Sequence, residues 1–397
     1  MIIKIIKRFL RRIAELVFQS SWYPNKKIIL ESNPDLSSQT YPVFRYMLDK
    51  KLNEEYKIIW LVKDKDKYRD YKVKNVFFAN YETKNIWMKL ERLYLLCTSR
   101  AIVYSHKYVG KIFPKQFLFY LRHGSFIKSR LKHCQKTYPN ECDACVCMSH
   151  FFDAIEEKQM MIPHERFVYT GYPTDDYILE TQDYSRALYP NEQFKKIIIW
   201  LPTFRKMRNA ARIDSSFDFP LGIPCLYSIE DCERLNHVLS ENNVLLLLKP
   251  HPAQDLSVIR DSGLSNLRII SDADLKSAGV ELYQYLGSTD ALITDYSSVY
   301  YDYLLTDRII GLTIDDIETY ASESGFAVDY FKVIVGEYMK CCDDMIEFVK
   351  RVAKGEDALA EKRKHVKAMI YDHCDATNTQ RVYDVLKSAL KERYGEL

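Results

Sequence analysis

The sequence predicts an α/β protein with two parallel sheets. Short apolar segments recur along the chain, and they are separated by segments whose apolar residues repeat with helical spacing. Strands that alternate with helices form a parallel sheet, because each helix returns the chain by a right-handed crossover. A polar stretch without a strand pattern, residues 177–195, divides the series into two sets. At 397 residues, 47% of them hydrophobic, the chain is long enough for two domains.

The first predicted domain spans residues 23–185 and is Rossmann-like. Its expected strands are short apolar segments at 27–30, 57–62, 76–79, 101–104, 116–122, 144–147 and 167–170. Helical spacing appears at 41–52 and 83–97, and Ser149 is expected to cap a third helix at 151–160.

The second predicted domain spans residues 186–397 and repeats this pattern. Its expected strands are 196–200, 244–248, 267–270, 291–294 and 309–312. Its expected helices are 229–240, 282–286, 299–305, 343–354, 359–369 and 382–392. Two Rossmann-like domains that face a cleft form the GT-B architecture, so the sequence predicts a GT-B-like fold.

Residues 1–22 are predicted to form an amphipathic helix at a membrane interface. On a helical wheel, the basic residues of positions 1–18 fall on one arc and the apolar residues fall opposite. Such a helix lies in the interface, whereas a secretory signal ends in small residues that are missing here. We therefore expect a peripheral protein on the cytoplasmic face of the cell membrane, in contact with its anionic surface. The alternative is a helix docked on the protein's own core.

Polar residues follow several predicted strands at the point where each strand ends. His123 follows strand 116–122, and Arg205 and His251 come shortly after strands 196–200 and 244–248. Ser297 and Ser298 lie between strand 291–294 and the helix expected behind it. Ligands of open α/β sheets bind beyond the carboxyl ends of strands, and unpaired N–H groups at a helix start favour an anion. The sequence thus predicts a site for an anionic ligand, and the alternative for the serines is a helix cap.

The distribution of charge supports this prediction. Residues 101–140 contain eight Lys and Arg residues and no acidic residue, and this basic stretch surrounds His123. It favours an anionic substrate or an anionic membrane. Nucleic acid is not an expected partner, because no recognised binding motif accompanies the charge. The cysteines near residue 145 are typical of small buried side chains, so we expect no metal site and no cofactor.

Four segments, taken in order, resemble the CDP-glycerol glycerophosphotransferase family, which includes the teichoic-acid primases and polymerases. They are residues 122–128, 202–205, 249–252 and 293–298. The resemblance implies a transferase in which an acceptor hydroxyl attacks the β-phosphorus of CDP-linked glycerol or ribitol and CMP leaves. It also implies an anionic acceptor that is lipid-linked or polymeric and belongs to a cell wall or capsule.

The same resemblance suggests a role for each candidate residue. His123 and His251 would be catalytic, with His123 as the expected base because it lies in the amino-terminal half, where the acceptor should enter. The alternative is that the two histidines exchange roles, which the sequence does not separate. The expected donor-binding residues are Arg205, Thr294, Asp295, Ser297 and Ser298, although Asp295 could instead orient its turn. Possible contacts to the acceptor or to a phosphate are Arg122, Ser125 and Lys128.

Departures from the family pattern make a capsule or other wall-polymer transferase as plausible as a teichoic-acid enzyme. Arg122, Ser125 and Phe126 stand where the family has Trp and Thr-Pro, Thr174 and Ser324 where it has arginine, and Ala376 where it has glycine. Two other functions also stay open. One alternative is a GT-B glycosyltransferase that uses a nucleotide sugar, and another is a non-catalytic, membrane-bound assembly partner. The segment 293–298 favours a phosphotransferase over the first, and the presence of both histidines argues against the second.

Overall fold

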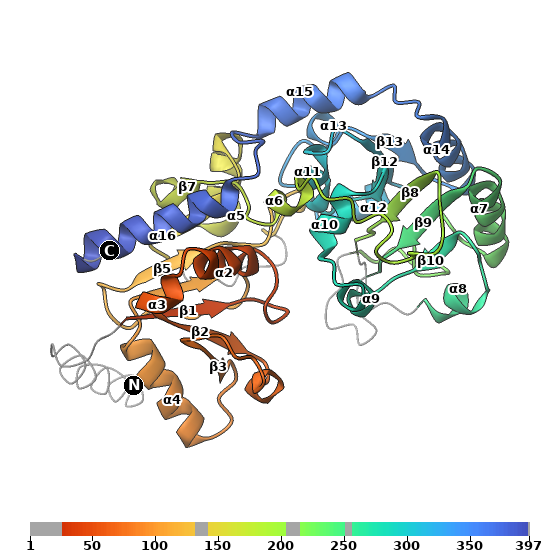
Figure 1. The fold of residues 1–397 in the computed structure, drawn as a ribbon. Coiled ribbons are helices and arrows are strands. Elements are labelled where there is room, and N and C mark those ends of the chain that lie inside the picture. The colour runs from red at the N-terminus through yellow and green to blue at the C-terminus, as the bar shows by residue number, and fades with distance from the viewer. Residues whose placement is uncertain (1–25, 132–141, 204–214, 251–255, 396–397) are drawn as a thin grey trace.

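The structure is a computed structural model that describes residues 26–131, 142–203, 215–250 and 256–395. Its two sheets lie in two lobes, as Figure 1 shows. The first sheet has the strand order β3-β2-β1-β4-β5-β6-β7, and the second has the order β10-β9-β8-β11-β12-β13. Every pairing between these strands is parallel. The predicted α/β, GT-B-like fold of two Rossmann-like units is thereby confirmed.

The amino-terminal lobe contains the first sheet and the helices that follow its strands. The strands are β1 Lys27–Glu31, β2 Lys57–Val62, β3 Val76–Asn80, β4 Ala101–Tyr104, β5 Phe117–Tyr120, β6 Ala144–Cys147 and β7 Phe167–Tyr169. The helices are α2 Thr40–Asp49, α3 Leu52–Glu55, α4 Ile86–Cys97, α5 Asp153–Met160 and α6 Asp175–Ile178. Short 3₁₀ turns are η1 Lys65–Tyr68, η2 His150–Phe152 and η3 His164–Arg166.

The carboxy-terminal lobe contains the second sheet. Its strands are β8 Lys196–Trp200, β9 Val244–Leu248, β10 Leu267–Ile269, β11 Ala291–Thr294, β12 Ile309–Thr313 and β13 Glu337–Met339. Its helices are α7 Ile229–Glu241, α8 Ser257–Asp261, α9 Asp272–Ser277, α10 Leu282–Gly287, α11 Val299–Leu304, α12 Ile317–Glu323, α13 Tyr330–Val333 and α14 Cys342–Lys354. The helices α15 Ala360–Ile370 and α16 Asn378–Tyr394 complete the described chain.

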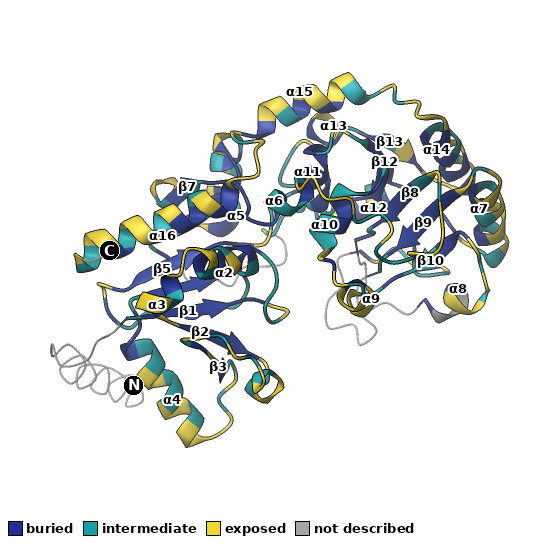
Figure 2. Cartoon of the chain, in the orientation of Figure 1, coloured by how far each residue is buried: buried dark blue, intermediate teal, exposed yellow. Residues whose placement is uncertain are grey.

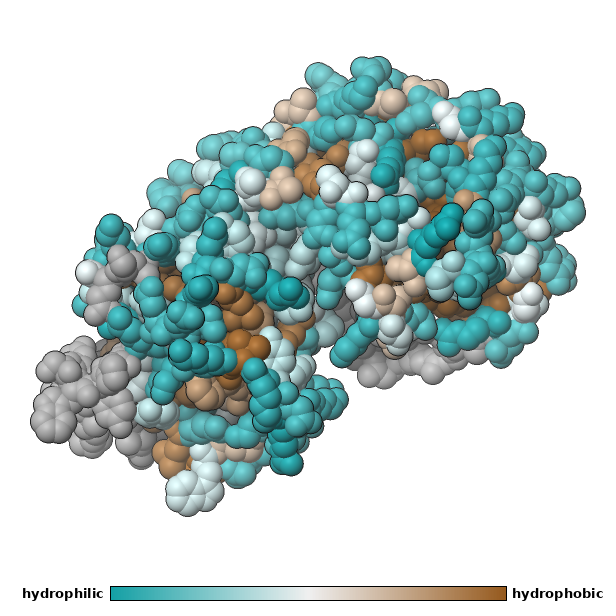
Figure 3. Space-filling model, viewed as in Figure 1, coloured by the Kyte–Doolittle hydropathy of each residue, from teal (hydrophilic) through white to brown (hydrophobic). Residues whose placement is uncertain are grey.

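The strands are hydrophobic because helices cover the sheets on both faces. Every residue of β4, β5, β6, β9, β11 and β12 is buried, as expected for parallel strands. Figure 2 shows this burial concentrated in the sheets, while α15 and α16 carry exposed residues on their outer sides. The face of the molecule shown in Figure 3 is mainly hydrophilic, with smaller apolar patches between polar regions.

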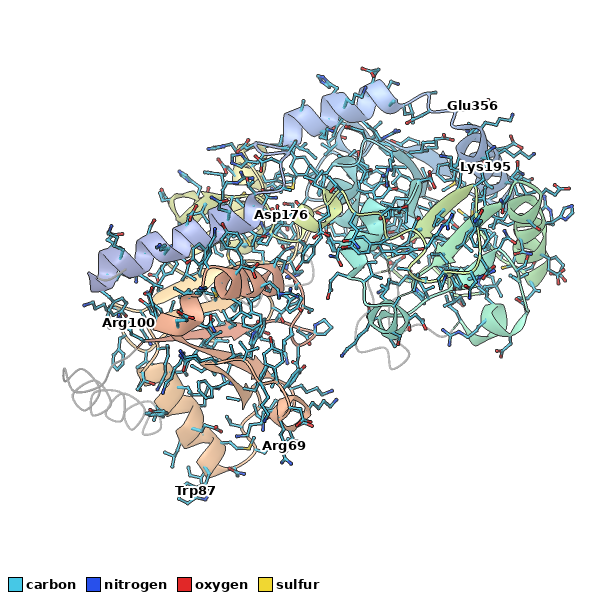
Figure 4. All side chains as sticks on the ribbon, in the orientation of Figure 1. Arg69, Trp87, Arg100, Asp176, Lys195 and Glu356 are labelled. Atoms are coloured by element: carbon cyan, nitrogen blue, oxygen red, sulfur yellow. The ribbon has the colours of Figure 1, made fainter. Side chains whose placement is uncertain are left out.

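The last helix returns to the amino-terminal lobe. Figure 1 shows α15 leaving the carboxy-terminal lobe and α16 lying along the first sheet, where it contacts α2 and β5. The carboxylate of Asp176 on α6 accepts the backbone N–H groups of Asn378 and Thr379 at 2.9 and 2.8 Å, which caps the start of α16 (Figure 4). The range 186–397 predicted for the second domain therefore includes a helix that packs on the first.

The two lobes share part of their core. One hydrophobic cluster contains Val103 of β4, Tyr301 of α11 and Leu312 of β12, so it runs from the first sheet into the second. A separate cluster fills the other face of the second sheet and contains Leu246 of β9 and Val349 of α14. The lobes are therefore in hydrophobic contact through this cluster.

Three local features bear on the sequence predictions: Ser149, the cysteines of β6 and the length of the helices. The hydroxyl of Ser149 caps no helix; it donates to the carbonyl of Ile370 at 2.6 Å. Cys145 and Cys147 are buried in β6, as expected for small hydrophobic side chains. In the described part of the chain, no helix is long and apolar enough to cross a membrane. The predicted amphipathic helix, residues 1–22, lies outside the described residues.

Candidate active site

The first half of the site lies at the carboxyl ends of β1, β4 and β5. The carboxylate of Glu31, which ends β1, accepts the backbone N–H groups of His106 and Lys107 at 3.1 and 2.9 Å. These bonds hold the turn that follows β4. His123 follows β5, and its Nδ1 lies 3.4 Å from the carbonyl oxygen of Ser105. Because a carbonyl only accepts hydrogen bonds, Nδ1 carries the proton and Nε2 is left as an acceptor.

The environment of His123 keeps its imidazole neutral. Part of the His123 side chain is exposed to solvent, but protein atoms surround the ring. This crowding, followed by the charge of Arg122, lowers the pKa of His123. The bond to Ser105 opposes the shift, and Arg130 and Lys128 add to it, so that the pKa falls to about 4. A neutral imidazole at pH 7 is able to accept the proton of a hydroxyl.

Arg122 and Ser125 support the His123 loop from inside the lobe. The guanidinium of Arg122 is only 2% exposed; it pairs with the buried carboxylate of Glu156 at 2.6 Å and donates to the carbonyl of Gly124 at 2.9 Å. The hydroxyl of Ser125 is buried, 3.2 Å from that of Tyr172. Both side chains are buried and bonded to protein groups, whereas the sequence predicted contacts to an acceptor or a phosphate.

The second half of the site lies at the carboxyl end of β11. Ser298 begins α11, and the carbonyls of Ser297 and Ser298 accept the N–H groups of Tyr300 and Tyr301 at 3.1 and 2.9 Å. Both serines are half-buried, and the hydroxyl of Ser298 makes no capping bond. The alternative role of Ser298 as a side-chain cap therefore does not describe this turn.

Thr294 and Asp295 hold the turn in place. The buried hydroxyl of Thr294 donates to the carbonyl of Leu201 at 2.8 Å. Both carboxylate oxygens of the buried Asp295 lie 2.9 Å from the N–H group of Thr203. The alternative that Asp295 orients its turn fits this geometry better than the predicted donor contact. Thr294 also differs from the prediction, because its hydroxyl already has a protein partner.

The two halves touch each other. Gly124 has a φ of +134°, and a Cβ atom at this position would lie 2.6 Å from Oγ of Ser298. Only glycine allows both this backbone conformation and this approach. Nearby, Lys128 forms an antiparallel bridge with Phe326, and the N–H group of Ser129 donates to the carbonyl of Gly325 at 2.9 Å. The contact brings the segment after His123 against the serine turn of the opposite lobe.

Two predicted site residues, Arg205 and His251, lie outside the described residues. Residues shortly before each of them in the sequence are described. Thr203, two residues before Arg205, is held by Asp295. Lys249, two residues before His251, pairs through Nζ with Asp272 at 2.8 Å. The roles of Arg205 and His251 stay predictions.

His106, which follows β4, was not predicted from the sequence as a site residue. Its ring stacks on that of His123, with centroids 4.8 Å apart and planes at 15°. Burial, then the charges of His123 and Lys107, lowers its pKa to about 3. The available signal was the same one that indicated His123, since His106 follows the end of β4 by two residues. Within the described ranges, no group of three or more His, Cys, Asp or Glu side chains is arranged to hold a metal ion.

Two parallel sheets joined in this way, with polar turns meeting at their carboxyl edges, define a GT-B-like protein. The chain belongs to the CDP-glycerol:poly(glycerophosphate) glycerophosphotransferase family, whose model matches residues 15–388. This match confirms the family that the sequence motifs indicated.

Named relatives agree with this assignment. The chain is 27% identical over 226 residues to the teichoic acid poly(ribitol-phosphate) polymerase of Bacillus spizizenii, covering 55% of this chain and 33% of that protein. It is 26% identical to the teichoic acid ribitol-phosphate primase of the same organism, covering 62% of this chain and 58% of the relative. The chain thus spans less than two thirds of the length of either relative.

A solved structure shows the same fold. The structure of the wall teichoic acid polymerase TagF matches 97% of this chain and 94% of its own, with a TM-score of 0.71 and 20% identity. A putative UDP-N-acetylglucosamine 2-epimerase from Listeria monocytogenes matches 92% of this chain and 97% of its own, with a TM-score of 0.55 and 11% identity. At these identities the likeness concerns the fold.

Proposed function

We propose that this chain transfers glycerol phosphate or ribitol phosphate from a CDP-linked donor to a hydroxyl of an anionic cell-wall acceptor. Membership of the glycerophosphotransferase family supports the reaction class. The observation that carries the proposal to particular residues is the contact between Gly124 and Ser298. It sets a neutral histidine of one lobe beside the half-buried serine turn of the other.

The proposed chemistry divides between the lobes. Nε2 of His123 takes the proton of the acceptor hydroxyl while the hydroxyl oxygen forms a bond to the β-phosphorus of the donor. The bond from that phosphorus to the oxygen of CMP breaks, and CMP leaves with the electron pair. Ser297 and Ser298 hold the pyrophosphate through hydroxyl and N–H groups. Arg205 and His251 are assigned to the same phosphates by their sequence motifs.

The reaction is tested with purified protein and three donors: CDP-glycerol, CDP-ribitol and a set of UDP-sugars. The expected product is CMP, released only when an acceptor with a free hydroxyl is present. Release of UDP would instead identify a glycosyltransferase. Release of neither nucleotide, from a protein whose folding is verified by circular dichroism, would favour the non-catalytic assembly partner. Parallel assays with teichoic-acid and capsule fragments distinguish the two classes of acceptor.

We further propose that residues 1–18 hold the protein on the cytoplasmic face of the cell membrane. A basic amphipathic helix combines burial of its apolar arc with attraction to anionic lipid, worth about 1 kcal/mol per basic residue near the surface. A CDP-linked donor is a cytosolic metabolite, and a lipid-linked acceptor would lie within reach.

Deletion of residues 1–18 tests this placement. The truncated protein should no longer float with anionic vesicles, and it should still release CMP with a soluble acceptor. Salt should weaken binding of the full chain without abolishing it, because the apolar contribution is not screened. Undiminished flotation of the truncated protein would assign membrane binding to the basic stretch between residues 107 and 136 instead.

A further inference from the structure

His106 has no part in the mechanism above, yet its ring lies parallel to the ring of the proposed base. Its Nδ1 is 3.4 Å from the backbone N–H group of Asn33. Because a backbone N–H only donates, this Nδ1 is unprotonated, and in the neutral ring the proton sits on Nε2. His106 therefore presents an N–H donor at the end of the ring that points away from Asn33.

His123 has the opposite arrangement. Its Nδ1 donates to the carbonyl of Ser105, so its Nε2 is an acceptor. Neither Nε2 atom has a hydrogen-bond partner among the residues that the structure describes. Two stacked rings with centroids 4.8 Å apart thus carry one free acceptor and one free donor.

This pair suits the end of an alditol phosphate chain. Such an end carries a hydroxyl, which needs an acceptor for its proton, and a phosphate only a few bonds away, which needs donors. The surroundings also favour an anion, because Lys107 acts on His106 while Lys128 and Arg130 act on His123. A neutral N–H group makes this attraction directional, because its hydrogen bond to a phosphate oxygen requires a nearly linear N–H···O arrangement.

We propose that His106 binds the acceptor, donating a hydrogen bond from Nε2 to the phosphate nearest the hydroxyl that His123 deprotonates. The inference rests on the proposed function for the identity of the acceptor. It makes a further statement, that this chain selects acceptors that already carry a phosphate beside the attacking hydroxyl. A role limited to packing against His123 would give no such selection.

The test compares two small acceptors, glycerol methyl phosphate diester and its uncharged counterpart, glycerol monomethyl ether. His106→Phe keeps a ring that stacks on His123 and removes the N–H donor. His106→Gln removes the ring and keeps an N–H donor on its planar amide. His237→Phe is the matched control, because His237 is exposed on α7 and pairs only with Glu241 at 3.1 Å.

For His106→Phe we expect the KM of the phosphodiester acceptor to rise about tenfold, the effect of losing one hydrogen bond to a charged group. The KM of the uncharged acceptor and the Kd of CDP-glycerol should stay unchanged, and His106→Gln should recover most of the loss. An equal rise for both acceptors, or no rise for either, would overturn the proposal. An increased Kd for CDP-glycerol would move His106 to the donor phosphates and also overturn it.

A binding measurement keeps the inference separate from the proposed reaction. In the wild-type protein with ¹⁵N-labelled histidine, addition of glycerol methyl phosphate diester should shift the Nε2 resonance of His106 and leave that of His237 in place. This result is expected whether or not CDP-alditols prove to be the donors. An unmoved His106 resonance at saturating diester would overturn the proposal, and the measurement also decides the case if His106→Phe does not fold.

Discussion

The carboxyl edges of the two sheets have the same topology and opposite chemistry. In the amino-terminal lobe the edge presents two imidazoles, His106 and His123, whose surroundings lower their pKa values. In the carboxy-terminal lobe the edge presents two serines, and the buried carboxylate of Asp295 lies behind them. One edge is suited to accepting a proton from a neutral hydroxyl, and the other is suited to holding an anion by hydrogen bonds.

The supporting charges differ in the same way. Behind His123 the buried Arg122 is balanced by Glu156. Behind the serine turn the carboxylate of Asp295 is balanced by backbone N–H groups. Each charge pairs with groups of its own lobe and orients a loop. The two edges therefore differ through the residues one or two positions farther along, His123 and Ser297.

The largest expected effect comes from removing the imidazole of the first edge. His123→Ala should lower turnover by at least about 100-fold, the low end for a lost general base, while the Kd of the CDP-alditol stays unchanged. His251→Ala carries the same expectation for turnover from its sequence motif. Steady-state kinetics and calorimetry with the donor measure the two quantities. If a folded His123→Ala protein turned over at a near-normal rate, His123 would have no part in the chemistry. The two edges would then not differ in the way proposed.

The next effect concerns the buried ion pair between Arg122 and Glu156, which lies behind His123. Glu156→Gln leaves the guanidinium of Arg122 buried without a charged partner, so we expect the free energy of unfolding to fall by about 3 kcal/mol. Urea denaturation measures this change. Glu157→Gln, on the same helix but exposed and near only His164, should change it by no more than about 0.5 kcal/mol. Equal stability of the two variants would show that the pair does not hold the His123 loop.

The sequence predicted the residues at the ends of the strands more accurately than the contacts that hold those residues in place. Strand ends are encoded locally, as apolar runs followed by polar residues, so His123 and Ser298 were placed at the correct edges. The partners of Arg122 and Thr294 are not encoded locally, because Glu156 and Leu201 come from other elements that only the fold brings near. These side chains were therefore assigned to ligands, whereas in the structure they bond to other protein groups.

Some short secondary-structure elements, including β13 and α6, were not predicted because their sequences carry too little local signal. β13, Glu337–Met339, has three residues and only one of them is buried, so it shows neither an apolar run nor a clear alternation. Its pairing with β12 defines it as a strand. α6 has four residues, fewer than a helical pattern needs to be recognised, and its place depends on contacts with α10. His106 follows a strand that was predicted, and it was overlooked because it lies outside the family motifs.

A smaller effect is expected at the second edge. Ser297→Ala, Ser298→Ala and Arg205→Ala should each weaken binding of the CDP-alditol about fivefold, which corresponds to about 1 kcal/mol for a lost hydrogen bond. The KM of the acceptor should change less. Ser322→Ala, on α12, serves as the control because the Ser322 hydroxyl is exposed and donates to the carbonyl of Thr319 at 2.9 Å. Unchanged donor affinity in all three variants would place the nucleotide elsewhere.

A last expected effect is a dependence of stability on pH at the first edge. In the unfolded chain a histidine has a pKa near 6.5, whereas burial lowers the pKa of His123 to about 4 and that of His106 to about 3. Between these values the unfolded chain binds protons that the folded protein does not, so the free energy of unfolding should fall as pH falls from 6.5 toward 4. The contribution of the two rings is fully present above pH 6.5. Urea midpoints measured from pH 7 to pH 4.5 should fall less steeply for His123→Phe and His106→Phe than for His237→Phe or the wild type. Parallel curves for all four proteins would mean that the imidazoles titrate normally, and the acid limb of the activity profile would then lie near pH 6.5 rather than near pH 4.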